Sequence, residues 1–145
     1  MTYNPLPLVQ QCIEMFGDTA VVLSKKETEA QWSLLKRMVP FTNNGKVAWE
    51  KVTKKQLVGN DGQEVLDALQ NLLEQPIDKT IYLQWSDATL PIVQTDLDTA
   101  LSLLGHIRKV TFELFFFNPH QGYLIEILPR DQITVGLVNS NVKGN

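Results

Sequence analysis

The sequence predicts an α+β domain, with helices packed on a mainly antiparallel sheet that ends in a three-stranded C-terminal meander. Two observations lead to this prediction. The first half of the chain has apolar residues at helical spacing, and the last third has three alternating apolar runs separated by turn residues. Helices layered on one face of such a sheet would bury both sets of apolar residues. The alternative has helices on both faces, and Phe115 and Phe117 favour it because the second face of their strand is also apolar.

Two helices are expected in the first forty residues. The first covers residues 5–16, where Asn4 can serve as the N-cap and Gly17 as the C-terminal stop. The second covers residues 27–38. It must end before Pro40, because a residue that precedes proline is disfavoured in the helical region.

A third helix, the clearest in the chain, is expected after Asp61, which fits a capping box with Glu64. Pro76 stops it. A fourth helix follows, with Thr95 as its cap and Asp98 at the third position. The apolar faces of these two helices comprise Val65, Leu66, Leu69, Leu72 and Leu73 in the third, and Leu97, Ala100, Leu101, Leu104 and Ile107 in the fourth.

Five segments have the composition or the alternation of strands, namely residues 20–23, 80–85, 110–117, 123–128 and 132–138. The first is expected to be buried, and the second is expected to join the C-terminal meander. Residues 41–59 contain a turn signal at Asn43-Asn44-Gly45 but fit no single element, and residues 139–145 are expected to be frayed. The expected core includes Leu66, Leu69, Leu73, Leu101, Leu104, Phe112, Leu114, Ile125 and Ile127.

The length and composition indicate one globular domain over residues 1–145. The chain has a mass of 16.4 kDa, with 43% hydrophobic and 20% charged residues. A single cysteine, Cys12, excludes an internal disulfide, and no stretch approaches the roughly 20 apolar residues of a membrane span. The N-terminal residues are not typical of a secretory signal. We therefore expect a cytoplasmic protein that does not associate with membranes.

The net charge of -3 conceals an uneven distribution of charge along the chain. Residues 1–60 have an excess of basic side chains. Residues 61–98 have eight acidic side chains and one basic side chain, Lys79. An acidic surface of this kind repels phosphate backbones and attracts a cationic partner, so binding of nucleic acid through this half is not expected. The alternative is that these carboxylates only solvate helix starts and loops.

Residues suited to catalysis are few. Cys12 lies on the apolar face of the first helix, which indicates a buried structural thiol rather than a nucleophile. His106 lies near a helix end and His120 in a hairpin loop, and their spacing suggests no acid–base pair. The chain contains no nucleotide-binding glycine motif, zinc-protease motif, serine-hydrolase elbow or calcium loop. We therefore expect no enzymatic activity, no metal site and no cofactor.

Two glutamates interrupt apolar strands of the predicted hairpin. Glu113 and Glu126 lie on neighbouring strands and can face the same side. Close carboxylates would raise a pKa or recruit a cationic partner, whereas the alternative is that both point to solvent. The aromatic side chains Trp85, Phe117 and Tyr123 are candidates for a binding patch or, alternatively, for the core.

The chain as a whole resembles the small immunity proteins of bacterial contact-dependent growth inhibition (CDI) systems. The resemblance is carried by residues 32–49 (WSLL…PFTNNGKVAW), 81–98 (IYLQWSDATLP…DLD) and 113–126 (ELFFFN…GYLIE). It implies a cytosolic antidote that binds the C-terminal toxin domain of a cognate exoprotein. Such toxins are often nucleases and hence basic, and the immunity protein often blocks the toxin's active site.

The acidic half suits this implied role, because complementary charge speeds association and rejects wrong partners. The expected function is neutralisation of a basic nuclease toxin, expected to be an RNase, whose active site is masked by an acidic surface. The alternative is a non-catalytic scaffold or ligand-binding regulatory domain. The candidate toxin-binding residues are Asp78, Asp87, Asp96, Asp98, Glu113, Glu126, Trp85 and Tyr123.

Overall fold

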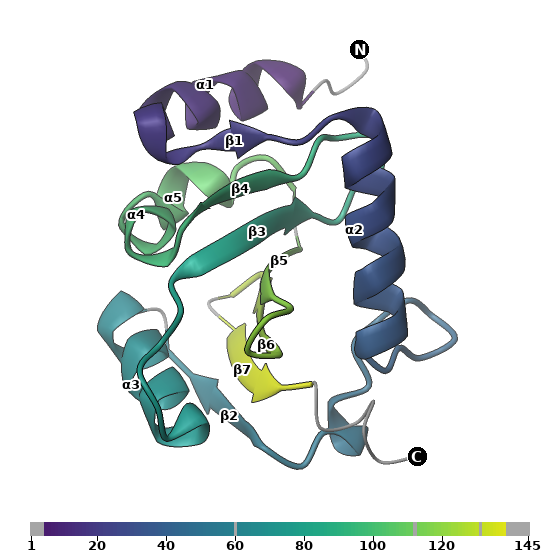
Figure 1. The fold of residues 1–145 in the computed structure, drawn as a ribbon, viewed down its shortest axis with the longest axis vertical. Coiled ribbons are helices and arrows are strands. Elements are labelled where there is room, and N and C mark those ends of the chain that lie inside the picture. Colours follow the sequence, from purple (N-terminus) through teal and green to yellow (C-terminus); the bar gives the residue numbers. More distant parts are fainter. Residues whose placement is uncertain (1–4, 60, 112, 131, 139–145) are drawn as a thin grey trace.

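The computed structural model describes residues 5–59, 61–111, 113–130 and 132–138, which form one antiparallel sheet covered by helices (Figure 1). The order of strands across the sheet is β1-β4-β3-β5-β6-β7-β2. The strands are β1 (Val21–Val22), β2 (Lys55–Val58), β3 (Thr80–Trp85), β4 (Val93–Asp96), β5 (Leu114–Asn118), β6 (Tyr123–Leu128) and β7 (Gln132–Leu137). The helices are α1 (Leu6–Phe16), α2 (Lys25–Met38), α3 (Gly62–Leu73), α4 (Leu97–Ser102) and α5 (Leu104–Ile107).

The predicted α+β class and the C-terminal meander are confirmed. Strands β5, β6 and β7 pair in chain order, with Phe116 opposite Ile125 and Ile125 opposite Val135. Strand β3 joins this meander through β5, where Trp85 lies opposite Leu114. Strands β3 and β6 begin and end at the expected residues, which were predicted for β3 from its composition and for β6 from the alternation of its side chains.

Helices cover both faces of the sheet, so the expectation of a single covered face is wrong and the three-layer alternative is correct. One core contains residues of α1, α3, α4 and α5 with one face of the strands. A second core contains residues of α2 and of segment 39–52 with the other face (Figure 1). The reason is that β5 and β6 are apolar on both faces: Phe115, Phe117 and Leu124 are buried on the α2 side. A strand that is apolar on both faces needs a layer on each.

Side-chain caps fix the starts of α2 and α3. Helix α2 begins two residues earlier than expected because Ser24 and Glu27 form a capping box. Asp61 caps α3 by accepting from the Gln63 N–H, but Glu64 does not complete a box, since its carboxylate accepts from the Gly59 N–H.

The expected cap of the fourth helix is also wrong, because that segment begins with a strand. Thr95 is part of β4, and the side chain of Asp96 caps α4 by accepting from the Thr99 N–H at 3.1 Å. The expected helix is divided into α4 and α5 at Leu103. Strand β4 was not predicted at all, because its four residues alternate too briefly to give a periodic signal.

The remaining differences from the predictions lie at the two edge strands of the sheet and in the core. Strand β1 is short, and its valines are exposed rather than buried. Segment 41–59 contains a Phe41–Val47 bridge around a turn, a 3₁₀ turn at Trp49–Lys51 and the other edge strand, β2. Of the expected core, Leu69, Leu104, Leu114, Ile125 and Ile127 are buried, whereas Leu66, Leu73 and Leu101 are half-buried against it. Asn4, Phe112 and residues 139–145 lie outside the described residues.

Candidate functional site

The structure brings three of the candidate carboxylates together at one end of the β3–β4 pair. Asp96 ends β4 opposite Thr80, the first residue of β3, and Asp78 precedes Thr80 by two residues. Asp98 lies in the first turn of α4, where its carboxylate forms an ion pair with Lys79 at 2.8 Å. These carboxylates therefore share one end of the sheet.

Helix α3 extends this acidic region along the same side of the molecule. Figure 1 shows α3, the start of β3 and α4 along one side of the sheet. We call this region the acidic side; its members are Asp61, Glu64, Asp67, Glu74, Asp78, Asp96 and Asp98. Carboxylates are ionised at neutral pH, and hydrogen bonds from N–H groups do not remove their charge. Lys79 is the only cationic side chain within residues 61–98.

The fold places the basic part of the sequence on the other side of the sheet. Helix α2 and residues 39–55 supply eight cationic side chains and three acidic ones. The cations are Lys25, Lys26, Lys36, Arg37, Lys46, Lys51, Lys54 and Lys55, and the acids are Glu27, Glu29 and Glu50. The uneven charge of the sequence thus becomes a separation of charge between the two helical layers.

Asp87 does not belong to the acidic side. It follows the C-terminal end of β3, and the six residues of that strand span about 20 Å. Its carboxylate accepts from both the N–H and the hydroxyl of Thr89, at 2.9 and 2.6 Å. These hydrogen bonds lower the pKa of Asp87. The structure thus separates Asp87 from Asp78 and its neighbours.

Glu113 and Glu126 face the same side of the sheet, as the sequence suggested; Glu113 is half-buried at the surface, and Glu126 does not point to solvent. Glu113 forms an ion pair with Lys46. Glu126 is buried and accepts a hydrogen bond of 2.7 Å from the indole N–H of Trp49. Burial raises the pKa of Glu126; the bond from Trp49 lowers it, and the nearby charge of Glu113 raises it further. Both glutamates therefore fasten segment 41–52 to the sheet.

Trp85 and Tyr123 are core residues, so of the two interpretations that the sequence left open the core is correct and a binding patch at these positions is not. The indole N–H of Trp85 donates to the Ile107 carbonyl at 3.1 Å, and the Tyr123 hydroxyl donates to the Asp78 carbonyl at 2.6 Å. Burial raises the pKa of Tyr123 above its ordinary value of 10.0. Tyr123 has an indirect role on the acidic side, because its hydroxyl fixes the backbone of Asp78.

The residues considered for catalysis, Cys12, His106 and His120, lie on separate elements. Cys12 is buried, and burial raises the pKa of its thiol, which opposes formation of a nucleophilic thiolate. His106 and His120 are exposed, one on α5 and one in the hairpin loop between β5 and β6. Across the described parts of the chain, no group of three histidine, cysteine or acidic side chains is arranged to hold a metal ion.

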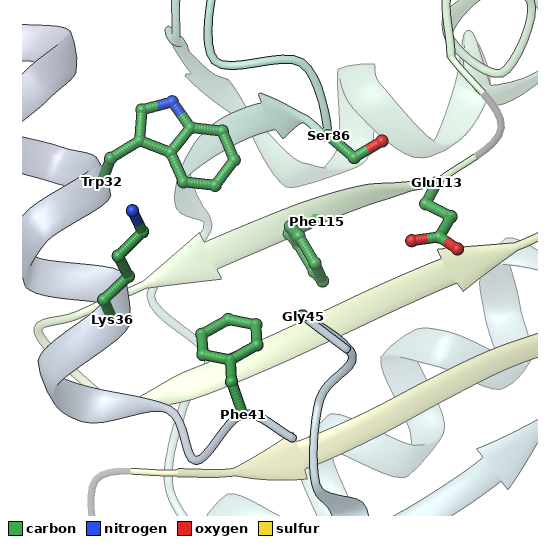
Figure 2. A pocket seen from close by; sticks show the side chains of 7 residues that line it. All are labelled: Trp32, Lys36, Phe41, Gly45, Ser86, Glu113 and Phe115. Atoms are coloured by element: carbon green, nitrogen blue, oxygen red, sulfur yellow. The ribbon is translucent and has the colours of Figure 1, made fainter. Parts of the chain in front are cut away.

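Two half-buried aromatic side chains, Trp32 and Phe41, and the buried Phe115 lie around a cavity on the α2 side. The cavity has a volume of about 470 Å³ (Figure 2). Its walls are formed by Trp32 and Lys36 of α2, by Phe41, Gly45 and Ser86, by Glu113 just before β5 and by Phe115 within β5. Sequence reasoning missed this cavity because its walls come from four separate parts of the chain. The one feature of the sequence that indicates such a cavity is the aromatic content of residues 32–49.

Comparison with models of protein families identifies the family of this chain. The family model described as CdiI immunity protein EcoliA0-like matches residues 6–136, which include every helix and all but the end of β7. A search of curated proteins finds no significant match. No helix in the described ranges is long and apolar enough to cross a membrane. Because the match spans most of the chain and nearly all of the sheet, this protein belongs to the CdiI immunity protein family, whose members protect against the toxins of contact-dependent growth inhibition.

Proposed function

We propose that this immunity protein neutralises a basic nuclease toxin by covering the toxin's active site with the acidic side. The family match supports immunity against a CDI toxin and a non-catalytic role. The observation that carries the finer proposal is the arrangement of charge. Seven of the eight carboxylates of residues 61–98 gather on one side of the sheet, with Lys79 as the one cation of that stretch.

The acidic side is suited to replace a phosphate backbone at a nuclease active site. Such an active site binds its substrate through lysine and arginine side chains, and carboxylates form strong charge-assisted hydrogen bonds with the same groups. Asp61, Glu64, Asp67, Glu74 and Asp98 are exposed, and Asp78 and Asp96 are half-buried. The hydrogen bonds that hold Asp78 and Asp96 in place reduce the entropy lost when a partner binds them.

Asp78 and Asp98 are the best positions for testing this proposal in cells. Bacteria that express the cognate toxin together with the Asp78→Lys/Asp98→Lys variant should stop growing, because reversed charge repels a basic toxin. Glu50→Lys is the matched control, since Glu50 is exposed on the α2 side, and it should protect like the parent. Equal protection by parent, double variant and control would refute the acidic-side mechanism.

In vitro, the purified toxin should degrade RNA, and the parent protein should stop this cleavage. A toxin without nuclease activity would refute the proposal that the target is a nuclease.

A further inference from the structure

The cavity on the α2 side has the size and the walls of a small-molecule site. Its volume of about 470 Å³ falls within the range of about 300–1,000 Å³ that is usual for ligand pockets. Three aromatic rings from separate elements converge on it, those of Trp32, Phe41 and Phe115 (Figure 2). The rings of Phe41 and Phe115 meet edge to face, with centroids 6.4 Å apart. Offset and edge-to-face packing suit a planar aromatic ring as the occupant.

The charges at this cavity favour an anionic occupant. Glu113 is the one carboxylate in the wall, and its charge is balanced by the ion pair with Lys46. Lys36 also lines the cavity, and among the described residues it has neither an ion pair nor a hydrogen bond (Figure 2). The surrounding α2 side has an excess of cations, as described above. The charge left unbalanced at the rim is therefore positive.

Buried polar atoms beside the cavity lack partners. The indole N–H of Trp32 has no acceptor among the described residues, and neither amide atom of Gln84 has a partner. Gln84 is fully buried and lies directly across the β3–β5 pair from Phe115, on the same face of the sheet. Buried polar groups are nearly always hydrogen-bonded to protein, water or a ligand. Trp32 itself lines the cavity, whereas Gln84 does not, so the indole N–H is the one of these unpartnered groups that belongs to a residue of the wall.

We propose that this cavity binds a small anion that carries a planar aromatic ring. The ring packs against Trp32, Phe41 and Phe115, and the anionic group pairs with Lys36. Glu113 uses one oxygen for Lys46, so its other oxygen remains available to accept from a hydroxyl or amino group of the ligand. A nucleoside monophosphate and an aromatic carboxylate both have this chemistry. The proposal is independent of the toxin, since the cavity and the acidic side lie on opposite faces of the sheet.

The test is an NMR titration of the ¹⁵N-labelled protein with adenosine monophosphate and, separately, with indole-3-acetate. Either or both should give saturable shifts at the Trp32 indole N–H, assigned with the Trp32→Phe variant, and at the amides of residues 41–45 and 113–115. Adenosine and indole-3-acetamide, which lack the anionic group, should bind about threefold to fivefold more weakly, as loss of one exposed charge pair predicts. Acetate and inorganic phosphate, which lack the ring, should not saturate.

Lys36→Ala should weaken binding of the anionic probe to the level of its neutral counterpart, whereas Lys26→Ala should not change it. Lys26 is the matched control, because it is an exposed lysine of the same helix that does not line the cavity. The two probes distinguish a nucleotide site from a site for aromatic acids. The proposal is overturned if neither probe saturates at millimolar concentration, if the neutral or ringless controls bind as well, or if the shifts lie elsewhere.

Discussion

Trp49 donates its indole N–H to the buried carboxylate of Glu126 over 2.7 Å, and its ring lies against the backbone of Gly136. One side chain from the segment after α2 thus crosses β6 and β7 and covers the second core. The ion pair between Lys46 and Glu113 fastens the same segment three residues before Trp49. The layer over the α2 face therefore depends on two polar anchors as well as on apolar packing.

Replacement of Glu126 should reveal the cost of burying its charge. Burial raises the pKa of Glu126 above its ordinary value of 4.5. Below that value the group is protonated in both states. As the pH rises towards the folded-state pKa, the unfolded chain releases a proton that the folded protein keeps, so stability is lost. Glu126→Gln cannot titrate, and its free energy of unfolding relative to the parent should therefore rise between pH 4 and pH 8.

Urea denaturation of the parent and of Glu126→Gln at several pH values measures this difference. Glutamine retains an oxygen that can accept from Trp49, which makes it the appropriate isostere. Glu50→Gln is the control, since Glu50 is exposed, and its difference from the parent should not vary in the same way. A Glu126→Gln difference that is flat or falls with pH would show that Glu126 is ionised without penalty.

Gly136→Ala should destabilise the protein through a steric conflict. A Cβ atom at this position would overlap the Trp49 ring and would lie 3.2 Å from the Lys54 carbonyl oxygen. Overpacking of this kind costs about 1–3 kcal/mol. Gly105→Ala is the control, because a Cβ atom there meets nothing within 4 Å. Thermal unfolding should show a lower midpoint for Gly136→Ala alone, and an unchanged midpoint would mean that Trp49 does not pack as described.

Asp96 combines a structural role with a proposed binding role, and two substitutions separate them. Asparagine caps helices about as well as aspartate, whereas alanine does not. Asp96→Ala should therefore lower the free energy of unfolding by about 1 kcal/mol, because it removes the cap of α4, and Asp96→Asn should lower it little. Toxin affinity should fall in both variants if the charge matters. Full affinity in Asp96→Asn would remove Asp96 from the binding surface.

The histidines should be dispensable for immunity. His106 and His120 are exposed and lie on different elements, and neither was found within a catalytic arrangement. The His106→Ala/His120→Ala variant should protect cells against the toxin as the parent does. A large loss of protection by the double variant with an unchanged circular dichroism spectrum would contradict this prediction, and the same loss by His120→Ala alone would identify the β5–β6 hairpin loop as part of the site.

Several elements were placed within one or two residues by the sequence, namely α1 and α3 by their apolar stripes, β3 by its composition and β6 by its alternation. Periodicity was not sufficient everywhere, because the strand expected over residues 110–117 begins only at Leu114 and the expected fourth helix is divided into α4 and α5. The sequence was least informative where tertiary contacts decide. Strand β4 has only four residues, and Trp49 covers Gly136 through a contact between residues far apart in the chain. Local patterns do not encode such contacts.

The same contrast applies to the candidate site. Charge counts identified the acidic stretch, because charge is a property of composition, and the fold kept Asp78, Asp96 and Asp98 together. The counts could not show that Asp87 would lie at the far end of β3. The burial of Trp85 and Tyr123 was equally hidden, since an aromatic residue in a strand is common both in cores and in binding patches.

The most direct test of the central claim is the rate at which this protein associates with its cognate toxin as the salt concentration is raised. Electrostatic steering increases association rates by about 10-fold to 1,000-fold and is screened by salt. We predict that the parent and Glu50→Lys associate at least about tenfold more slowly in 500 mM than in 20 mM NaCl. Asp78→Lys/Asp98→Lys should associate slowly at both concentrations. If the double variant associates as fast as the parent and salt has no effect on either, the acidic side does not bind the toxin.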